Sequence, residues 1–181
     1  MTSSTALMIV DVQNAMFADP ELPLHNGKEV LSNIQRLLQK AREDGLPVIY
    51  IQHTSTSDDE FSEGKPTWHI HPSIAPQPNE SVVRKSSWDA FYQTELLAKL
   101  QELNIQKLVI CGMQTEFCLD TTSRGAYSLG YHHNVLISDA HSTFDSKVLP
   151  AADIIKHHNQ MLGGRFVQLM KTEDILAKGF N

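Results

Sequence analysis

Cys118 is the side chain of this protein best placed to act as a nucleophile. It is the last residue of the segment 111–118 (CGMQTEFC), which follows a run of apolar residues that predicts a buried strand. Thr115 is a candidate N-cap, and the pattern over residues 116–129 predicts a helix. The thiol would then lie in the first helical turn, where unpaired amides favour a thiolate and lower the pKa of a cysteine. Cys111 falls inside the strand, where we expect an inert thiol.

Asp11 and Lys85 are the charged residues that could assist such a thiol. Asp11 follows the apolar run 6–10, and Lys85 ends another short apolar strand. A carboxylate beside a thiol can take its proton, and an ammonium can stabilise the negative charges that result. The backbone N–H groups of Gln114 and Cys118 lie where an oxyanion hole could form. Each side chain alone fits an ordinary structural role, so the prediction depends on all three lying together.

The hydrophobic pattern predicts six strands that alternate with amphipathic helices. This alternation implies parallel strands, right-handed crossovers and helices on both faces of the sheet. We therefore expect an α/β fold, a three-layer α-β-α domain over residues 1–181 with a doubly wound six-stranded parallel sheet in the order 3-2-1-4-5-6. The expected strands are residues 6–10, 47–51, 81–85, 108–111, 134–138 and 165–169.

Capping residues predict where the helices begin and end. Side chains that can accept a hydrogen bond from the first turn precede each helix, and glycines follow several of them. The expected N-caps are Asn26, Thr94, Ser146 and Thr172, and the expected helix stops are Gly45, Gly130 and Gly163-Gly164.

The expected topology brings the chemical residues together. A doubly wound sheet binds its ligand beyond the carboxyl ends of the strands, where the strand order reverses, which is between strands one and four. Asp11 ends strand one and Cys118 follows strand four, so the two should face each other across this crevice. The segment 54–79 is a long loop rich in Ser, Asp, Pro and His. Loops of that length are usually functional, and we expect a lid or an oligomer contact.

Composition excludes several classes of function. The formal net charge of −6, without a cluster of Lys or Arg, argues against binding to nucleic acid. No apolar stretch approaches the roughly 18 residues that a membrane span needs, so we expect no membrane partner. The first residues, MTSST, lack the features of a signal peptide, and two cysteines cannot form a secreted disulfide framework. We therefore expect a cytoplasmic protein.

Three separated motifs occur in an order that is typical of one family. They are residues 9–13 (IVDVQ), 83–85 (VRK) and 112–118 (GMQTEFC), and further matching residues extend the likeness to Ala140. This pattern resembles the isochorismatase-like cysteine hydrolases. The resemblance implies the six-stranded parallel sheet and assigns the catalytic Asp, Lys and Cys to Asp11, Lys85 and Cys118. It also implies a non-proline cis peptide at Met113-Gln114, which would aim the Gln114 N–H into the oxyanion hole.

The function implied by this resemblance is hydrolysis of a small amide, carbamoyl or ureido C–N bond through a thioester on Cys118. Isochorismatases proper lack the cysteine and cleave a vinyl ether, so Cys118 argues against that activity. The family resemblance also implies a homo-oligomer, a dimer or a larger assembly.

No metal or other cofactor is expected. Nicotinamidases of the same superfamily often hold a metal with an Asp-x-His pair after strand two, and here that position reads Ile51-Gln52-His53, without the carboxylate. His69 and His71 have a spacing that suits metal ligands, but no acidic partner accompanies them.

The walls of the substrate pocket are less certain than the catalytic residues. His53 closes strand two at the crevice, where it either contacts substrate or is an ordinary rim histidine. The other candidates are one polar residue and four aromatic ones, each of which could equally belong to the core. They are Gln13, Phe17, Trp88, Phe91 and Phe117.

Three alternatives to a metal-independent amidohydrolase remain open. The first is a nicotinamidase-like, metal-assisted amidase with altered ligands. The second is a non-catalytic binding protein that kept the fold, although such a protein has no need for all of Asp11, Lys85 and Cys118. The third is a redox role for Cys118, for which a resolving partner is lacking.

Overall fold

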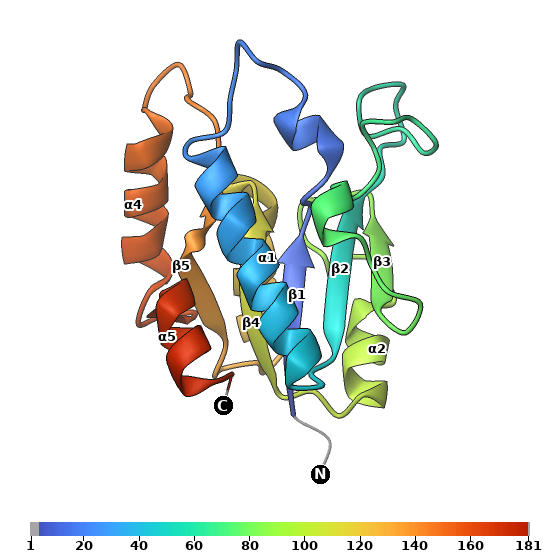
Figure 1. Cartoon of the computed structure of the whole chain (residues 1–181), viewed down its shortest axis with the longest axis vertical. Coiled ribbons are helices and arrows are strands. Elements are labelled where there is room, and N and C mark those ends of the chain that lie inside the picture. Colours follow the sequence, from blue (N-terminus) through green and yellow to red (C-terminus); the bar gives the residue numbers. More distant parts are fainter. Residues whose placement is uncertain (1–3, 181) are drawn as a thin grey trace.

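The computed structural model, which describes residues 4–180, has a parallel sheet at its centre (Figure 1). All five strand pairings are parallel, and the order is β3-β2-β1-β4-β5-β6. The predicted fold class and strand order are therefore confirmed, while the domain limits at residues 1 and 181 lie outside the described residues. The strands are β1 (Thr5–Val10), β2 (Val48–His53), β3 (Ser81–Lys85), β4 (Lys107–Met113), β5 (Val135–Ser142) and β6 (Gln168–Met170).

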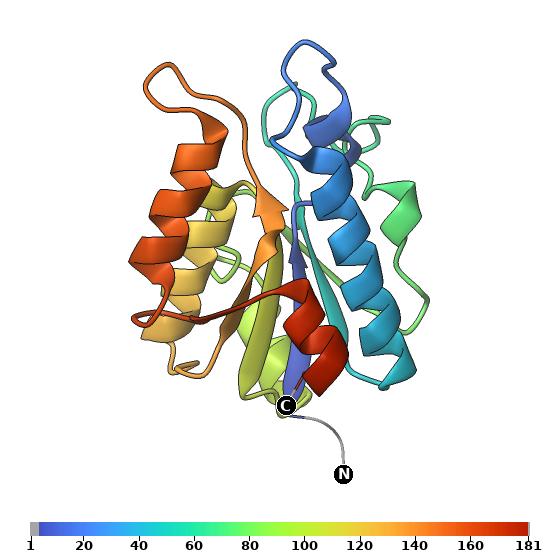
Figure 2. The same cartoon turned by 60° about the vertical axis from the view of Figure 1, so that its left-hand side comes forward.

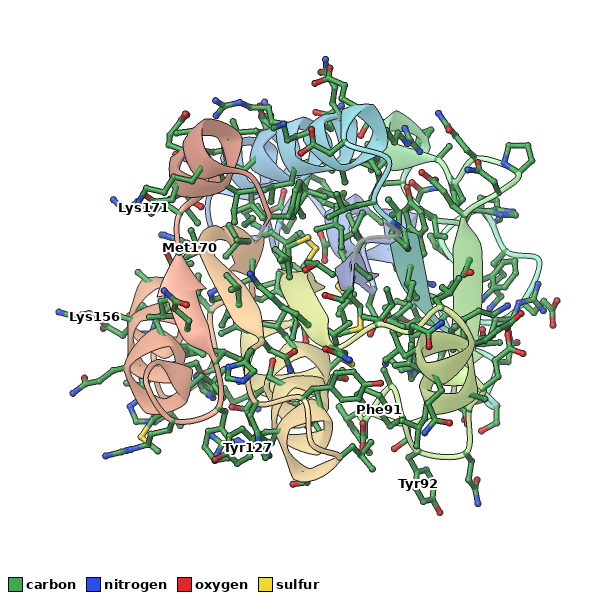
Figure 3. The ribbon with its side chains drawn as sticks, turned by 90° about the horizontal axis from the view of Figure 1, so that it is seen from below. Phe91, Tyr92, Tyr127, Lys156, Met170 and Lys171 are labelled. Atoms are coloured by element: carbon green, nitrogen blue, oxygen red, sulfur yellow. The ribbon has the colours of Figure 1, made fainter. Side chains whose placement is uncertain are left out.

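Helices cover both faces of this sheet, which gives three layers (Figures 2 and 3). One face carries α1 (Gly27–Glu43) and α5 (Thr172–Lys178), and the other carries α2 (Leu96–Glu102), α3 (Asp120–Ser128) and α4 (Ala151–Leu162). Every residue of β1 is buried, and its side chains alternate between two apolar cores, one on each face. Three short helical turns complete the chain: η1 (Asn14–Phe17), η2 (Pro72–Ile74) and η3 (Thr115–Leu119).

Three predicted N-caps, Thr94, Ser146 and Thr172, are wrong. Glu95 and Lys171 occupy the N-cap positions of α2 and α5, each one residue from the predicted cap. Ser146 does not cap α4: its hydroxyl accepts hydrogen bonds from Val148 N and Leu149 N within a turn, and the helix begins only after Pro150. Proline suits this position because its fixed φ is compatible with a helix start and its missing N–H would have no helical partner there. Asn26 does occupy the N-cap position of α1, but its side chain makes no capping hydrogen bond.

Strand β6 was also misplaced. It spans Gln168–Met170 rather than 165–169, because residues 163–167 form a turn in which Gly163 and Val167 make an isolated bridge. The shift places Met170 opposite Ile137 of β5. Neither error affects the carboxyl ends of β1, β3 and β4.

The segment 54–79 lies against η1 and contains only the short turn η2 as helical structure. Three backbone hydrogen bonds tie it there: Asn14 N donates to His69 O, Ala15 N to Thr67 O, and His71 N to Val12 O, at 2.8 to 3.0 Å. These hydrogen bonds hold residues 67–71 beside the end of β1, and the role of the segment as a lid or an oligomer contact stays a prediction. Over residues 4–180, no helix has both the length and the apolar character needed to cross a membrane.

Candidate active site

Asp11 leaves the sheet directly after β1 through a turn in its own backbone. Its φ of 48° lies in the left-handed region, which Asp tolerates better than most residues. Its amide is held by a 3.0 Å hydrogen bond to Ile51 O of β2. Beside it, Gly112 of β4 lies so close to Val10 that a Cβ atom would come within 2.1 Å of the Val10 carbonyl oxygen. Glycine at 112 therefore allows β4 to approach β1 where the Asp11 carboxylate enters the crevice.

Lys85 joins the other two catalytic candidates. Its Nζ lies 2.7 Å from Asp11 Oδ2, donates to Cys118 Sγ at 3.1 Å, and donates to the carbonyl oxygen of Ser87 at 2.9 Å. The side chains of Asp11 and Lys85 are both fully buried. The structure thus brings together Asp11, Lys85 and Cys118, which come from the carboxyl ends of β1 and β3 and from η3.

The Cys118 thiol does not have the low pKa that its position near a helix start suggests. Burial and the Asp11 carboxylate raise its pKa, the Lys85 ammonium lowers it less, and the result is about 12. For Lys85, burial lowers the pKa but Asp11 and Cys118 outweigh it, so the pKa is raised and the ammonium is retained. The expectation of a resting thiolate is therefore wrong, because burial of the sulfur and then the neighbouring carboxylate raise the pKa more than Lys85 lowers it.

The Asp11 carboxylate is free to act on that thiol. Oδ2 lies 2.7 Å from Lys85 Nζ, and neither buried oxygen accepts a hydrogen bond of normal geometry from a residue in the described range 4–180. Because Oδ2 is paired with Lys85, Oδ1 is the oxygen left to accept a proton. A neutral thiol beside a free carboxylate oxygen is the resting state that a proton-transfer step requires.

A cis peptide bond joins Met113 to Gln114, as the family resemblance implied. Gln114 is the first residue after β4, and Cys118 lies in η3, a π-helical turn that continues into α3. The expected regular helix from residue 116 is thus replaced at its start by a wider turn. Gln114 and Cys118 both line the same cavity, and we predict that their backbone amides form the oxyanion hole.

A buried chain of hydrogen bonds that the sequence analysis missed holds this turn. Thr115, expected to be an N-cap, instead pairs its hydroxyl with His141 Nδ1 at 2.8 Å, and His141 Nε2 lies 3.0 Å from Asn159 Oδ1 of α4. Because an amide oxygen only accepts, Nε2 carries the proton and Nδ1 accepts from the Thr115 hydroxyl. The position of His141 at the end of β5, one strand from Cys118, is the only signal that sequence offered.

His141 should make the protein less stable in mild acid. Burial lowers its pKa from about 6.5 to about 4. Between pH 6.5 and pH 4, His141 is therefore protonated in the unfolded chain and neutral in the folded protein. The contribution of His141 to the free energy of unfolding is therefore fully present above pH 6.5, and it falls by about 3 kcal/mol as the pH drops toward 4. The measurement is the free energy of unfolding in urea from pH 7.5 to 4 for the wild type and for His141→Gln.

We expect the free-energy difference between wild type and His141→Gln to shrink by that amount over this pH range. Substitution of the exposed His133 by Gln serves as the control and should leave the pH dependence unchanged. Parallel curves for the wild type and His141→Gln would show that His141 is not held neutral.

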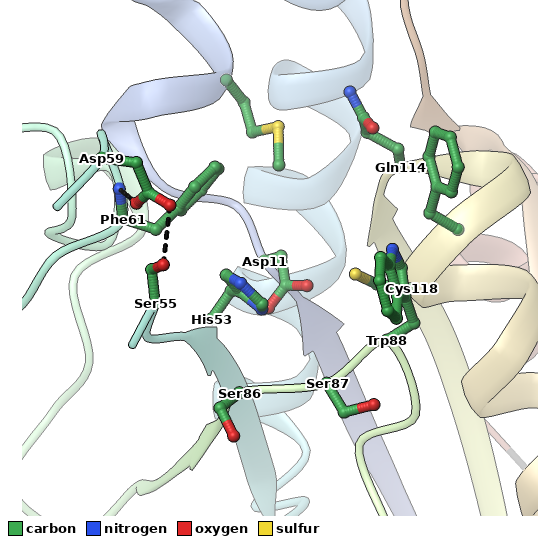
Figure 4. A pocket seen from close by; sticks show the side chains of 12 residues that line it. Asp11, His53, Ser55, Asp59, Phe61, Ser86, Ser87, Trp88, Gln114 and Cys118 are labelled. Atoms are coloured by element: carbon green, nitrogen blue, oxygen red, sulfur yellow. Dashed lines mark hydrogen bonds between the residues drawn. The ribbon is translucent and has the colours of Figure 1, made fainter. Parts of the chain in front are cut away.

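A cavity of about 480 Å³ opens over the catalytic residues (Figure 4). Of the predicted pocket residues, His53, Trp88 and Phe117 line it, and the last two are 60% and 45% exposed at its mouth. Six residues that sequence reasoning did not select line it as well, three of them from the segment 54–79. They are Met16, Ser55, Asp59, Phe61, Ser86 and Ser87.

Three predicted pocket residues lie elsewhere. Gln13 is fully buried, and its side-chain amide exchanges hydrogen bonds with the backbone of His53 and donates to Trp68 O, so it positions the end of β2. Phe17 packs edge-on against His71, with ring centroids 5.0 Å apart. Phe91 packs against Tyr131 and the core below α3.

His53 is a neutral histidine with a defined tautomer. Its Nδ1 lies 3.3 Å from Lys85 Nζ, and because an ammonium only donates, Nδ1 is the acceptor and Nε2 carries the proton. Burial, then the Lys85 charge, lowers its pKa. His53 therefore offers the cavity a neutral N–H donor. As for a metal, no group of three or more His, Cys, Asp or Glu side chains within residues 4–180 has the arrangement of a ligand set.

Comparison with known proteins identifies relatives across the whole fold. The family model for the isochorismatase domain matches residues 5–174. The uncharacterized isochorismatase family protein YddQ of Bacillus subtilis is 32% identical over 96% of this chain and 99% of its own. A putative isochorismatase hydrolase from Oleispira antarctica has a solved structure with a TM-score of 0.91, at 32% identity, covering 98% of this chain and 99% of that one.

Two relatives carry the names of hydrolases with stated substrates. A streptothricin hydrolase of Streptomyces noursei is 37% identical over 81% of this chain, which spans 51% of that protein. A ureidoacrylate amidohydrolase of Azorhizobium caulinodans is 27% identical over 75% of each chain. The matched domain, the sheet order and the grouping of Asp11, Lys85 and Cys118 agree, and this chain belongs to the isochorismatase family of hydrolases.

Proposed function

We propose that this protein is a metal-independent cysteine hydrolase that cleaves a small amide, carbamoyl or ureido C–N bond through a thioester on Cys118. The observation that carries the proposal is the buried Lys85 ammonium, which lies within 3.1 Å of both the Asp11 carboxylate and the Cys118 sulfur, two groups that line an open cavity. A binding-only pocket would not keep a thiol and two buried charges in this arrangement.

Formation of the thioester begins with proton transfer. Asp11 Oδ1 takes the proton of the Cys118 thiol, and the thiolate, stabilised by Lys85, attacks the substrate carbonyl carbon. The oxyanion that forms is stabilised by the N–H groups of Gln114 and Cys118. When the C–N bond breaks, the protonated Asp11 gives its proton to the leaving nitrogen, and ammonia or an amine departs.

Hydrolysis of the thioester uses the same groups in reverse. Asp11 takes a proton from water, the resulting hydroxide attacks the thioester carbonyl, and the C–S bond breaks. The thiolate leaves as the acid product is released, and Asp11 returns the proton to sulfur. The sum is one water consumed, with one acid and one ammonia or amine formed, so the resting thiol is restored without any cofactor.

The partners, the oligomeric state and the cellular location of the protein are also proposals. The net charge of −6 argues against nucleic acid as a partner, and we propose a cytoplasmic homo-oligomer that acts on a free small molecule. A metal-assisted, nicotinamidase-like reaction is the second candidate within enzymes, but no observation of the site favours it over the metal-independent route.

Ammonia release from a panel of small primary amides, carbamoyl compounds and ureido compounds tests the function. We expect turnover of at least one of them, unaffected by a chelator. Sensitivity to chelation would favour the metal-assisted alternative. Silence across the panel, with no acyl group found on Cys118 after incubation with activated esters, would favour a binding protein that kept the fold.

A further inference from the structure

The wall of the cavity opposite Cys118 carries one charged residue that the reaction does not use. Figure 4 shows Asp59, with Ser55 and Phe61, on the side away from Cys118, Trp88 and Gln114. Asp59 comes from the segment 54–79, whose backbone is tied to η1. The catalytic carboxylate of Asp11 is deep in the crevice and paired with Lys85, so its charge is already balanced.

The Asp59 carboxylate is held in place by neutral donors. The Ser55 hydroxyl donates to Oδ2 at 2.6 Å and the Phe61 amide donates to Oδ1 at 2.8 Å. These two hydrogen bonds, the Ser55 hydroxyl first, lower the pKa of Asp59, so it is ionised at neutral pH. Each carboxylate oxygen can accept a second hydrogen bond, so the group is oriented but not saturated.

Asp59 forms no ion pair with any residue from 4 to 180. The nearby Lys65 pairs with Asp58, and Arg84 pairs with Glu63. None of the side chains that line the cavity belongs to Lys or Arg, and His53 is neutral. The Asp59 wall of the cavity is therefore negatively charged, and the lining offers only neutral donors to a carboxylate.

We infer that the substrate carries a positively charged nitrogen group, an ammonium or a guanidinium, at the end remote from the bond that is cleaved, and that Asp59 binds it. This inference rests on the proposed amide hydrolysis and names its substrate class. A cationic group would neutralise the charge of Asp59. The carbon chain that joins this group to the amide would lie along Phe61 and Met16. Amides that carry a carboxylate at that end would meet an unbalanced negative charge and be rejected.

The test uses primary amides with three to five methylene groups between the amide and the far end. Each length is made with an ammonium, a methyl or a carboxylate group at that end. Two quantities are measured: kcat/KM for ammonia release by the wild type, and the dissociation constant for Cys118→Ala, which binds without turnover. At the best length, we expect the ammonium compound to have a kcat/KM about tenfold higher and a dissociation constant about tenfold lower than the methyl compound.

Two matched variants assign the preference. Asp59→Asn should reduce the ratio between ammonium and methyl compounds to about one, whatever its effect on the methyl compound alone. Asp58→Asn removes the same charge from the next residue, whose side chain is 91% exposed, and should keep the tenfold ratio.

The outcomes separate this inference from the proposed hydrolysis. Preferred binding of the ammonium series without ammonia release would support the inference and contradict the proposed hydrolysis. Ammonia release with no preference for the cation would support the proposed hydrolysis and contradict the inference. The inference is overturned if no length shows the preference, if Asp59→Asn retains it, if the carboxylate series is preferred, or if none of the compounds binds.

Discussion

Substitution of Cys118 by alanine is expected to lower kcat for amide hydrolysis by about 10⁴-fold or more, whereas Cys111→Ala should change it by less than about twofold. Cys118 supplies the attacking atom, and without it the thioester cannot form. Cys111 is fully buried in β4, its pKa is raised by burial, and its sulfur faces the carbonyl oxygen of Met8.

Both variants can be measured on the compound that gives the highest turnover in the ammonia assay. The Cys111 variant controls for the loss of a buried thiol, because both proteins lose one sulfur from the neighbourhood of β4. Comparable activity in the two variants would contradict covalent catalysis by Cys118.

Substitution of Asp11 by asparagine should have two opposite effects on Cys118. Hydrolysis should fall by about 10²- to 10⁴-fold, because the group that moves the proton is lost. Alkylation of Cys118 at neutral pH should become faster, because the carboxylate that raises the thiol pKa is gone while the Lys85 ammonium remains 3.1 Å from the sulfur. The measurements are kcat/KM and the rate of reaction with iodoacetamide from pH 6 to 10.

Lys85→Met is the matched variant, since it removes the other charge of the same buried pair. It should slow both hydrolysis and alkylation, because the group that lowers the pKa of Cys118 is lost and the buried Asp11 charge is left alone. It should also destabilise the protein by about 3 to 5 kcal/mol. If alkylation became slower in Asp11→Asn as well, Asp11 would not be what keeps the thiol protonated.

The strand order and the catalytic group could be predicted from the sequence because both depend on patterns along the chain. A strand buried on both faces is a continuous apolar run, as at residues 5–10, and a doubly wound sheet places the residues after such runs at one edge. Asp11 and Cys118 both follow strands, so the topology predicted that these two face each other, and the family resemblance added Lys85.

The residues that line the pocket were harder to predict from the sequence, because part of its wall comes from a segment without hydrophobic periodicity. Ser55, Asp59 and Phe61 lie in the segment 54–79, where neither a helical nor a strand pattern indicates which side chains face inward. Gln13 shows the reverse case. A polar residue two positions after Asp11 suggested substrate binding, but its amide satisfies backbone groups of His53 and Trp68.

The pKa of Cys118 and the role of His141 required three-dimensional distances. The helix-start argument counts only local amides, whereas the pKa of the thiol depends on burial and on a carboxylate 107 positions away in the chain. Thr115 is a good N-cap by type, yet its hydroxyl bonds His141 across the sheet edge. Sequence spacing alone identifies neither Asp11 as the neighbour of Cys118 nor His141 as the partner of Thr115.

The thioester on Cys118 is the central claim, and acid quench followed by mass spectrometry tests it most directly. The substrate is an activated ester of the acid that the enzyme releases, chosen so that acylation is faster than hydrolysis of the intermediate. We predict that the peptide containing Cys118 gains the mass of one acyl group during turnover and loses it once the substrate is consumed. Steady turnover of the same ester with Cys118 unmodified at every quench time would contradict the account.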